Sequence, residues 1–511
     1  MSDTKEVAFA TDKALMPSTA MPPPSSSSDK VESPLLKTTK DGIVLVPQPS
    51  DDPDDPLNWN FTKKHAAMFF LALESLLVKF SGSLIAPGAH RIAIDFHVTP
   101  TQATYIGSAQ SILYSIAPIF WIPVSHRIGR RPVLLMSQII AMISAIGVAR
   151  SQTYAQAMVC RMIMGFGGSG GLCIGPAAIS DMFFLHEKGS RMGINSILLV
   201  VAPYVGGVAG GSIQQNPKLG WRWSMYVAAI CYAFQLFGQF FFVPETIYER
   251  EVVAAEPAAN KRTIWRRLGF RTPTNPTGET YLETFSRPFA MFVYPAVVLP
   301  SFWVSVAVMT EVANTAGFAL NFGTASKYHF TTAQVGYCYF AGFIGALAGE
   351  LCAGPLCDFV VKRTLRKEEP WRAEKLLKLS ITGLVTLAVG LIIYGVEYDV
   401  GHTWAAPLSG ILLFVFGQEI LVTVIMTYMC DCYPEQAAEV SIVFQFFFNV
   451  MCFHPPFYTP LWIQQHGAKV PYIVYGLLPV VLFPVFIVPF MLKGEQIRSK
   501  GALFRWSKKN N

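Results

Sequence analysis

The chain has 511 residues, of which 52% are hydrophobic and only 14% are charged. Soluble globular proteins carry roughly 25% charged residues, so this composition excludes an ordinary soluble domain. The formal net charge is +7, but the basic residues lie beside apolar runs. This placement indicates that they orient the chain in a membrane and do not bind nucleic acid.

The first segment, residues 1–63, is polar and rich in proline and serine, as in "MPPPSSSSDK" and "PSDDPDDP". Such a composition is typical of disordered chains, so we expect a disordered cytosolic tail. From Ala66 onward, long apolar runs alternate with short charged connections. This alternation predicts an all-α membrane protein with many spans.

Twelve segments are long and apolar enough to cross a bilayer, which needs about 20 residues per helix. They are residues 65–86, 104–124, 132–150, 156–180, 192–213, 223–243, 289–312, 333–356, 376–396, 405–429, 437–461 and 471–492. The longest connection separates two groups of six helices. We therefore predict a first half over 64–243, a cytosolic central loop over 244–288, a second half over 289–493 and a basic cytosolic tail over 494–511.

Lysine and arginine are divided unevenly between the two sides of the predicted membrane. With the N-terminus in the cytosol, 32 of the 40 basic residues lie on the inner side and six on the outer side. Because basic residues are retained on the cytosolic side, we expect both termini to be cytosolic. The glycosylation sequon at Asn60 would then face the cytosol, so we predict that it carries no glycan.

A basic turn that contains a glycine follows the second predicted span, in "VSHRIGRR" (residues 124–131). A second copy, "LCDFVVKR" (residues 356–363), follows the eighth span, and in this alignment His126 matches Asp358. Charged turns at equivalent places indicate two structurally related six-helix halves, or pseudo-repeats. Parallel repeats of this kind are typical of transporters that bind their substrate between the halves.

The first turn resembles the signature loop of the major facilitator superfamily, and further motifs of that family follow in order. "RMIMGFG" (residues 161–167) is similar to its intramembrane arginine motif, and "APYVGG" (residues 202–207) resembles the span-five motif of its antiporters. "DPLNW", "GWRW" and "PETIYERE" resemble fungal members of the twelve-span drug:proton antiporter branch. The resemblance implies the two-half helical fold of that family and proton-driven export of small organic compounds.

We expect the basic turn to act as a cytosolic latch, whose arginines bond helix ends and an acid at the foot of the fourth span. A topology signal alone is the simpler alternative. The family's usual aspartate is replaced by His126, and whether this histidine responds to pH or is a tolerated loss stays open. The predicted latch residues are His126, Arg127, Gly129, Arg130, Arg131 and Asp181 in the first half and Gly354, Asp358 and Arg363 in the second.

Five charged residues fall inside predicted spans, namely Glu74, Lys79, Arg161, Glu311 and Glu419. A charge within the bilayer normally faces a cavity or a partner, so each is a candidate for proton coupling. In the first half, we expect Arg161 to lie near Glu74 and to tune its proton affinity. A static buried ion pair is the alternative for Glu74 and Glu419, and an interfacial position is the alternative for Glu311.

The fifth predicted span contains Pro203, Gly206 and Gly207, which predict a bend and a small-residue face for close helix contacts. In the eleventh, the aromatic run "VFQFFFNVMCFHPPFY" (residues 443–458) either lines an adaptable pocket or faces lipid. Within this run, Pro455-Pro456 predicts an interruption of the helix.

Together these features predict a proton-driven carrier of small organic compounds in the plasma membrane, an exporter by resemblance, that acts as a monomer. We expect no metal or cofactor, because the nine cysteines show no ligand spacing, and a proton gradient would supply the energy. Two alternatives remain: a proton-coupled importer of a cationic nutrient such as a polyamine, and a membrane receptor that does not transport. An enzyme is disfavoured, since no catalytic set or phosphate-binding loop stands out.

Overall fold

The computed structural model describes residues 37, 45, 47–216, 218–248, 286, 289–366, 372–433 and 436–501. The chain divides into two units, Met1–Gln48 and Pro49–Asn511. In the first unit, the backbone N–H of Lys37 donates to Gln48 Oε1 at 2.9 Å. Most of the predicted tail, most of the predicted central loop and the end of the C-terminal tail lie outside the described residues.

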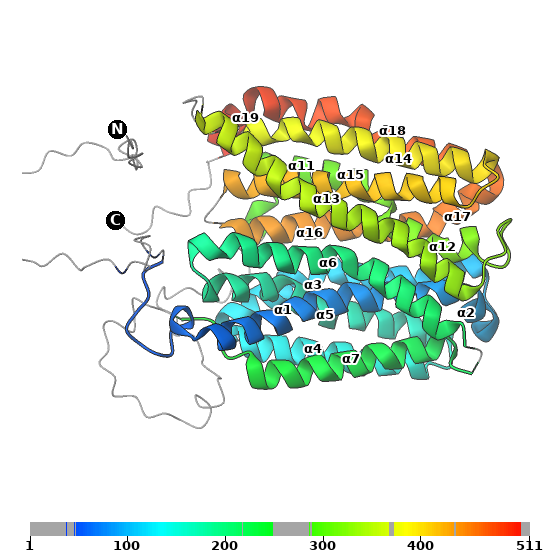
Figure 1. The fold of residues 1–511 in the computed structure, drawn as a ribbon, viewed down its shortest axis with the longest axis horizontal. Helices are drawn as coiled ribbons and strands as arrows, with labels where there is room; N and C mark the ends of the chain where they lie inside the picture. Colours follow the sequence, from blue (N-terminus) through cyan, green and yellow to red (C-terminus); the bar gives the residue numbers. More distant parts are fainter. Residues whose placement is uncertain are drawn as a thin grey trace, which may run out of the picture. The chain divides into compact units, whose positions relative to one another are not determined.

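The second unit is built of helices, and its described residues contain no β-strand. Figure 1 shows the long helices running side by side, with α1 to α7 along one side and α11 to α19 along the other. The first group comprises α1 (Phe61–Ser83), α2 (Ala89–Phe96), α3 (Pro100–Ile128), α4 (Arg130–Arg150), α5 (Tyr154–Met182), α6 (Leu185–Gln214) and α7 (Gly220–Phe242), with the 3-10 turn η2 (Ala86–Gly88) between α1 and α2.

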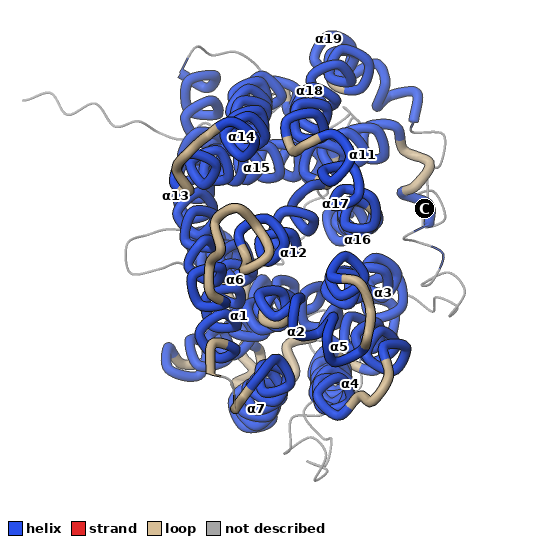
Figure 2. Tube along the Cα trace, turned by 90° about the vertical axis from the view of Figure 1, so that its right-hand side faces the viewer, coloured by secondary structure: helices blue, strands red, loops and turns tan. Residues whose placement is uncertain are grey.

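The second group repeats the pattern of long helices joined by short connections. It comprises α11 (Pro295–Val308), α12 (Thr310–Phe322), α13 (Thr332–Arg366), η3 (Ala373–Leu379), α14 (Ser380–Val400), α15 (Ala405–Cys432), α16 (Ala437–Phe453), α17 (Pro455–His466), α18 (Lys469–Phe486) and α19 (Val488–Gly501). Seen along the helices in Figure 2, the groups form two bundles, with α6, α12 and α16 near the boundary between them. The predicted all-α, two-half fold is confirmed.

Eleven helical stretches of the described residues are long and apolar enough to cross a membrane. The one predicted span without a counterpart among these eleven is the second, residues 104–124. It corresponds to α3, whose 29 residues extend about 43 Å at ~1.5 Å per residue. That length exceeds the roughly 30 Å of a bilayer core, but glutamine, serine and threonine lower the apolarity of α3. The helix packs against α5 and α16, and most of these polar side chains, such as those of Ser108 and Gln110, are buried.

Among the described residues, three predicted spans of the second half are interrupted, at Met309, His454 and Ile487. The break between α16 and α17 lies at His454, where Pro455-Pro456 predicts it, because proline cannot donate the helical backbone hydrogen bond. This prediction is confirmed. The break between α11 and α12 at Met309 was not expected, since the predicted seventh span continues through it.

The expectation of disorder up to residue 63 is wrong for residues 50–60. Asp55 is completely buried, and its carboxylate accepts hydrogen bonds from the backbone N–H groups of Ser50 and Leu57, each at 3.0 Å. These bonds hold the 3-10 turn η1 (Pro56–Asn58) just before α1. An aspartate that accepts from nearby backbone N–H groups stabilises a turn locally, so this part of a polar segment is ordered.

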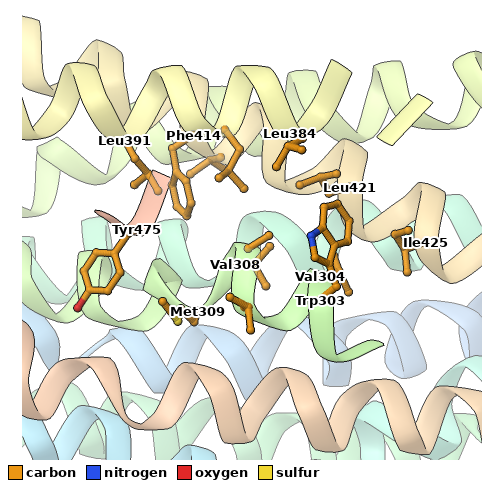
Figure 3. Packing of buried hydrophobic residues seen from close by; sticks show 14 of the residues in the cluster. Trp303, Val304, Val308, Met309, Leu384, Leu391, Phe414, Leu421, Ile425 and Tyr475 are labelled. Atoms are coloured by element: carbon orange, nitrogen blue, oxygen red, sulfur yellow. The ribbon is translucent and has the colours of Figure 1, made fainter. Parts of the chain in front are cut away.

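The second half has a close-packed core between α11, α14, α15 and α18, which Figure 3 shows. Trp303 is fully buried there, and its indole Nε1 donates to the Pro479 carbonyl oxygen of α18 at 2.9 Å. Leu391 of α14 and Phe414 and Leu421 of α15 fill the surrounding space. Because dense packing holds membrane helices together, α15 is anchored against its neighbours on this side.

Candidate functional site

A polar pocket lies at the boundary between the two halves. The first half contributes residues of α1, η2, α3 and α6, and the second contributes residues of α12 and α16. The lining residues are Lys79, Gly82, Ser83, Ala86, Gly107, Gln110, Ser111, Tyr114, Pro203, Glu311, Val312, Thr315 and Asn449. A concave site with a few convergent polar groups between two bundles is suited to bind a small molecule.

Lys79 of α1 brings a positive charge to this pocket. Its ammonium lies 5.5 Å from the ring centroid of Tyr114 and 5.3 Å from that of Phe448. Both distances are within the range in which a cation is attracted by an aromatic face. Lys79 also interacts electrostatically with Glu311 and Glu419 of the opposite half.

Glu311 lines the pocket. Of the two alternatives that its sequence position left open, a cavity-facing residue and an interfacial one, the structure supports the first. The reason is the break at Met309, because α12 begins at Thr310 and places Glu311 in its first turn. One carboxylate oxygen of Glu311 has no hydrogen-bond partner among the described atoms. The side chain is therefore directed at the space between the halves and not at the membrane surface.

Glu419 of α15 lies close behind Glu311 and is only 6% exposed. Gln418 Nε2 approaches one of its carboxylate oxygens at 3.5 Å. On the other side, a Cβ added at Gly349 of α13 would lie 2.8 Å from the Glu419 Cβ. The glycine thus lets α13 pack directly against the stem of this glutamate.

A third carboxylate of the second half, Glu350, was missed by the sequence analysis. Its charge acts on Glu419, and it accepts a hydrogen bond from the Thr423 hydroxyl at 3.4 Å. Glu350 lies within the predicted span 333–356. The rule that selected the other charges, a carboxylate inside an apolar segment, would have found it.

Glu74 does not line the pocket but is enclosed within the first half. It is completely buried, and Gln239 of α7 donates a hydrogen bond to one of its carboxylate oxygens. Its carboxyl group lies directly against the backbone of Gly171 in α5, where any added Cβ would collide with it. From α1, Glu74 thus packs against α5 and α7 of the same half.

Arg161 is also completely buried, but it does not contact Glu74. Its guanidinium donates to the backbone carbonyl oxygens of Ile106, Ser81 and Gly82, at 3.2, 3.1 and 2.9 Å. The expectation that Arg161 lies beside Glu74 is therefore wrong in this conformation. Arg161 instead joins α5 to α1 and α3, and it supports Gly82, which lines the pocket.

The basic turn of the first half (residues 124–131) forms the contact that its sequence predicts, since Arg130 makes an ion pair with Asp181 at the end of α5. Gly129 has a φ angle of 107°, which L-amino acids with a side chain rarely adopt. Glu245, which follows α7, was not anticipated here. Its carboxylate accepts from the backbone N–H groups of Arg130 and Arg131, at 3.1 and 3.0 Å, at the start of α4.

The second copy of the turn does not exist as a turn. Helix α13 continues without interruption to Arg366, and Gly354, Asp358 and Arg363 are exposed on it. Val361 occupies the position of Gly129 in the alignment, and a β-branched residue does not adopt the conformation that breaks the helix there. Among the described residues, neither Asp358 nor Arg363 forms an ion pair, so the prediction of a second latch at these residues is wrong.

The glycines of the fifth predicted span form two contact surfaces on α6. A Cβ at Gly206 would collide with the Phe80 carbonyl oxygen of α1, and one at Gly207 would collide with the Tyr339 ring of α13. Helix α6 thus packs closely against both halves, as small residues permit. It runs as one helix through Pro203, so a bend there stays a prediction.

Comparisons with known proteins agree with this architecture. The family model described as "Major Facilitator Superfamily" matches residues 71–456. The "Cycloheximide resistance protein" of Candida maltosa is 25% identical, with 93% of this chain and 91% of that protein covered. The "MFS-type transporter penM" of Penicillium rubens is 27% identical over 88% of each chain. The "Major facilitator superfamily multidrug transporter FLU1" of Candida albicans is 25% identical, with 92% of this chain and 77% of that protein covered.

Two solved structures have the same fold. The xylose transporter XylE from E. coli, in a partially occluded inward-open conformation, superposes with a TM-score of 0.60 at 14% identity, covering 84% of this chain and 98% of XylE. The human organic anion transporter MFSD10 gives a TM-score of 0.54 at 16% identity, covering 82% of this chain and 98% of MFSD10.

Proposed function

Because the chain belongs to the Major Facilitator Superfamily, we propose that it is a proton-driven carrier that exports small organic compounds across the plasma membrane. The observation that carries the proposal is the pocket between the halves, to which the first half brings Lys79 and the second half brings Glu311. Charges from both halves at one pocket couple ligand binding to the relative position of the halves. Relatives named for cycloheximide resistance and multidrug transport support export.

Protons are the proposed source of energy, without a metal or other cofactor. Glu311 and Glu419 are the favoured proton-binding groups, because the nearest cation, Lys79, belongs to the other half. A movement of the halves would change the distance between these charges and so change the proton affinity of the carboxylates. Glu74 is the remaining candidate for the proton-binding group. It does not contact Arg161, so that arginine gives no support to a role of Glu74 in proton coupling.

The proposal includes a monomeric carrier with both termini in the cytosol. The cytosolic ion pair of Arg130 with Asp181 and the capping of α4 by Glu245 would then stabilise one of the alternating conformations. Such contacts, when broken and remade, shift the balance between states.

Transport into inside-out plasma-membrane vesicles tests the direction and the driving force. The lumen of these vesicles corresponds to the cell exterior, so an acidic lumen should drive accumulation of exported compounds, beginning with cycloheximide and a panel of organic cations and neutral drugs. A protonophore and vesicles without the protein are the controls. Accumulation only from an acidic medium would indicate the importer, and ligand binding without transport under any gradient would indicate the receptor.

A further inference from the structure

The ammonium of Lys79 lies between aromatic rings that come from different halves. Tyr114 belongs to α3 and Phe448 to α16, and both ring centroids are within 6 Å of the Lys79 Nζ, at 5.5 and 5.3 Å. Glu311 faces the same space from α12. Two aromatic faces and a carboxylate are the groups that recognise an organic ammonium ion.

Lys79 is not fixed in this place by an ion pair. It interacts electrostatically with Glu311 and Glu419, but among the described residues it has no carboxylate oxygen within 4.0 Å. Its stem is flexible and partly exposed to the pocket. The ammonium can therefore leave the aromatic rings without the loss of a direct salt bridge.

Polar groups beside the lysine have hydrogen-bonding capacity left for a ligand. Gln110 is 5% exposed and Tyr114 is 3% exposed, and both line the pocket. Gln110 Oε1 and the Tyr114 hydroxyl have no hydrogen-bond partner among the described atoms. Buried polar atoms are usually paired, so these two mark a place where a ligand completes the site.

We propose that Lys79 occupies a binding site for organic cations, formed by Tyr114, Phe448 and Glu311, and that a cationic substrate takes the place of the lysine ammonium there. This inference rests on the proposed function, in which the pocket binds the transported compound. It adds the substrate class, which is an amine or quaternary ammonium compound with an apolar body. Lys79 is then an internal competitor that keeps the empty site neutralised.

The charges of the second half favour a cation over an anion. Lys79 acts on both Glu311 and Glu419, and Glu350 adds a further negative charge beside Glu419. The faces of aromatic rings also carry partial negative charge. An anion bound to Lys79 would lie beside Glu311 and would be repelled. An organic cation adds the charge that this cluster lacks.

Binding to purified detergent-solubilised protein tests the inference without any need for transport. The probe is benzyltrimethylammonium, and neopentylbenzene, which has the same shape without the charge, is its neutral control. Lys79→Met removes the competing ammonium and keeps an apolar stem, so it should tighten binding of the cation about tenfold and leave the neutral compound unchanged. Lys79→Arg keeps the charge and should not tighten binding.

The site itself is tested by variants of its walls. Phe448→Leu and Glu311→Gln should each weaken cation binding about tenfold. Tyr114→Phe keeps the aromatic face, and because a quaternary ammonium has no N–H to donate to the lost hydroxyl, it should have little effect on binding of this probe. Gel filtration checks folding, and Lys79→Gln replaces Lys79→Met if the latter aggregates. Equal tightening of the neutral compound, or unchanged cation binding in Lys79→Met, would overturn the inference.

The same variants in vesicles separate this inference from the proposed function. If the wild-type protein transports compounds but Lys79→Met binds the cation unchanged, the carrier stands and the cation site is refuted. If Lys79→Met tightens cation binding but no compound is transported under any gradient, the cation site stands and the carrier is refuted. Tighter binding of benzylsulfonate than of the cation by the wild-type protein would also refute the cation site.

Discussion

In the first half, Arg161 donates to three backbone carbonyl oxygens and Glu74 accepts from Gln239, so both buried charges have their partners within that half. In the second half, Glu311 lines the pocket and interacts with Glu419 behind it, and the nearest cation comes from the opposite half. A movement between the halves therefore leaves the surroundings of Arg161 and Glu74 unchanged. The same movement changes the distance from Lys79 to Glu311 and Glu419. Charges that hold a bundle together and charges that respond to its movement can be distinguished in this way.

The two halves also differ at the end of the bundle where the basic turn lies. The first half has a glycine turn held by Arg130, Asp181 and Glu245, whereas the second half continues α13 as a helix through the aligned segment. On that side the second half has a different contact, in which Arg498 of α19 pairs with Glu374 of η3 at 2.7 Å. Each half thus has an ion pair at this end of the bundle, but the two pairs join different elements.

The comparison is tested most strongly by neutralising one carboxylate in each half. Glu419→Gln should abolish accumulation against a gradient, because the proton cycle would be lost, while exchange of substrate across the membrane continues. Glu74→Gln keeps the hydrogen bond with Gln239 and the volume of the side chain, so accumulation should stay close to that of the wild type. Vesicle transport under several imposed pH gradients measures both.

The reverse result would move the coupling site to the first half. Loss of accumulation in Glu74→Gln, with normal accumulation in Glu419→Gln, would show that Glu74 carries the proton despite its separation from Arg161. In that case, accumulation by Glu311→Gln would show whether a carboxylate of the second half takes part in proton coupling.

Arg161 holds three helices of the first half together, so a substitution of Arg161 should lower the stability of the protein. Arg161→Lys keeps the charge but cannot donate to Ile106, Ser81 and Gly82 together, and each buried carbonyl left unpaired costs roughly 1–3 kcal/mol. We expect a lower melting temperature in detergent, with substrate affinity little changed in the protein that remains folded. A protein as stable as the wild type but unable to couple transport to protons would contradict this role.

The basic turn is tested by giving the first half the residue that the second half has at the aligned position. Gly129→Val introduces the side chain found at Val361 where φ is 107°, so we expect the turn to distort and transport to slow about tenfold, or ~1.4 kcal/mol in the barrier. Gly354→Val is the matched control, because a Cβ at Gly354 meets no atom within 4 Å. Equal rates in both variants and the wild type would reduce the turn to a topology signal.

The smallest expected effect concerns the start of the first half. Asn60 Oδ1 caps α1 by accepting from the Lys63 backbone N–H at 2.9 Å, whereas α11 begins at Pro295 without a side-chain cap. Asn60→Ala should cost about 1 kcal/mol of stability and Asn60→Asp almost none. Endoglycosidase treatment should not change the electrophoretic mobility of the wild-type protein, which should migrate like both variants. A mobility shift traced to Asn60 would overturn the predicted orientation.

The sequence by itself determined the helical membrane class, the two halves, the helix break at Pro455-Pro456 and the ion pair of Arg130 with Asp181. These features depend on apolar length, on proline chemistry and on charges at helix ends, all of which are local. The sequence also identified the charged residues inside the predicted spans, except Glu350. It did not determine their partners, because these lie on helices far apart in the chain.

Only the tertiary structure decided where those charges lie. The unexpected break at Met309 turned Glu311 into the pocket, and the packing of α5 on α1 and α3 gave Arg161 carbonyl partners in place of Glu74. The direction of a side chain around a helix axis is set by how helices pack, which periodicity alone does not specify. The cation site of Lys79, Tyr114 and Phe448 is the clearest case, since it exists only where the two halves meet.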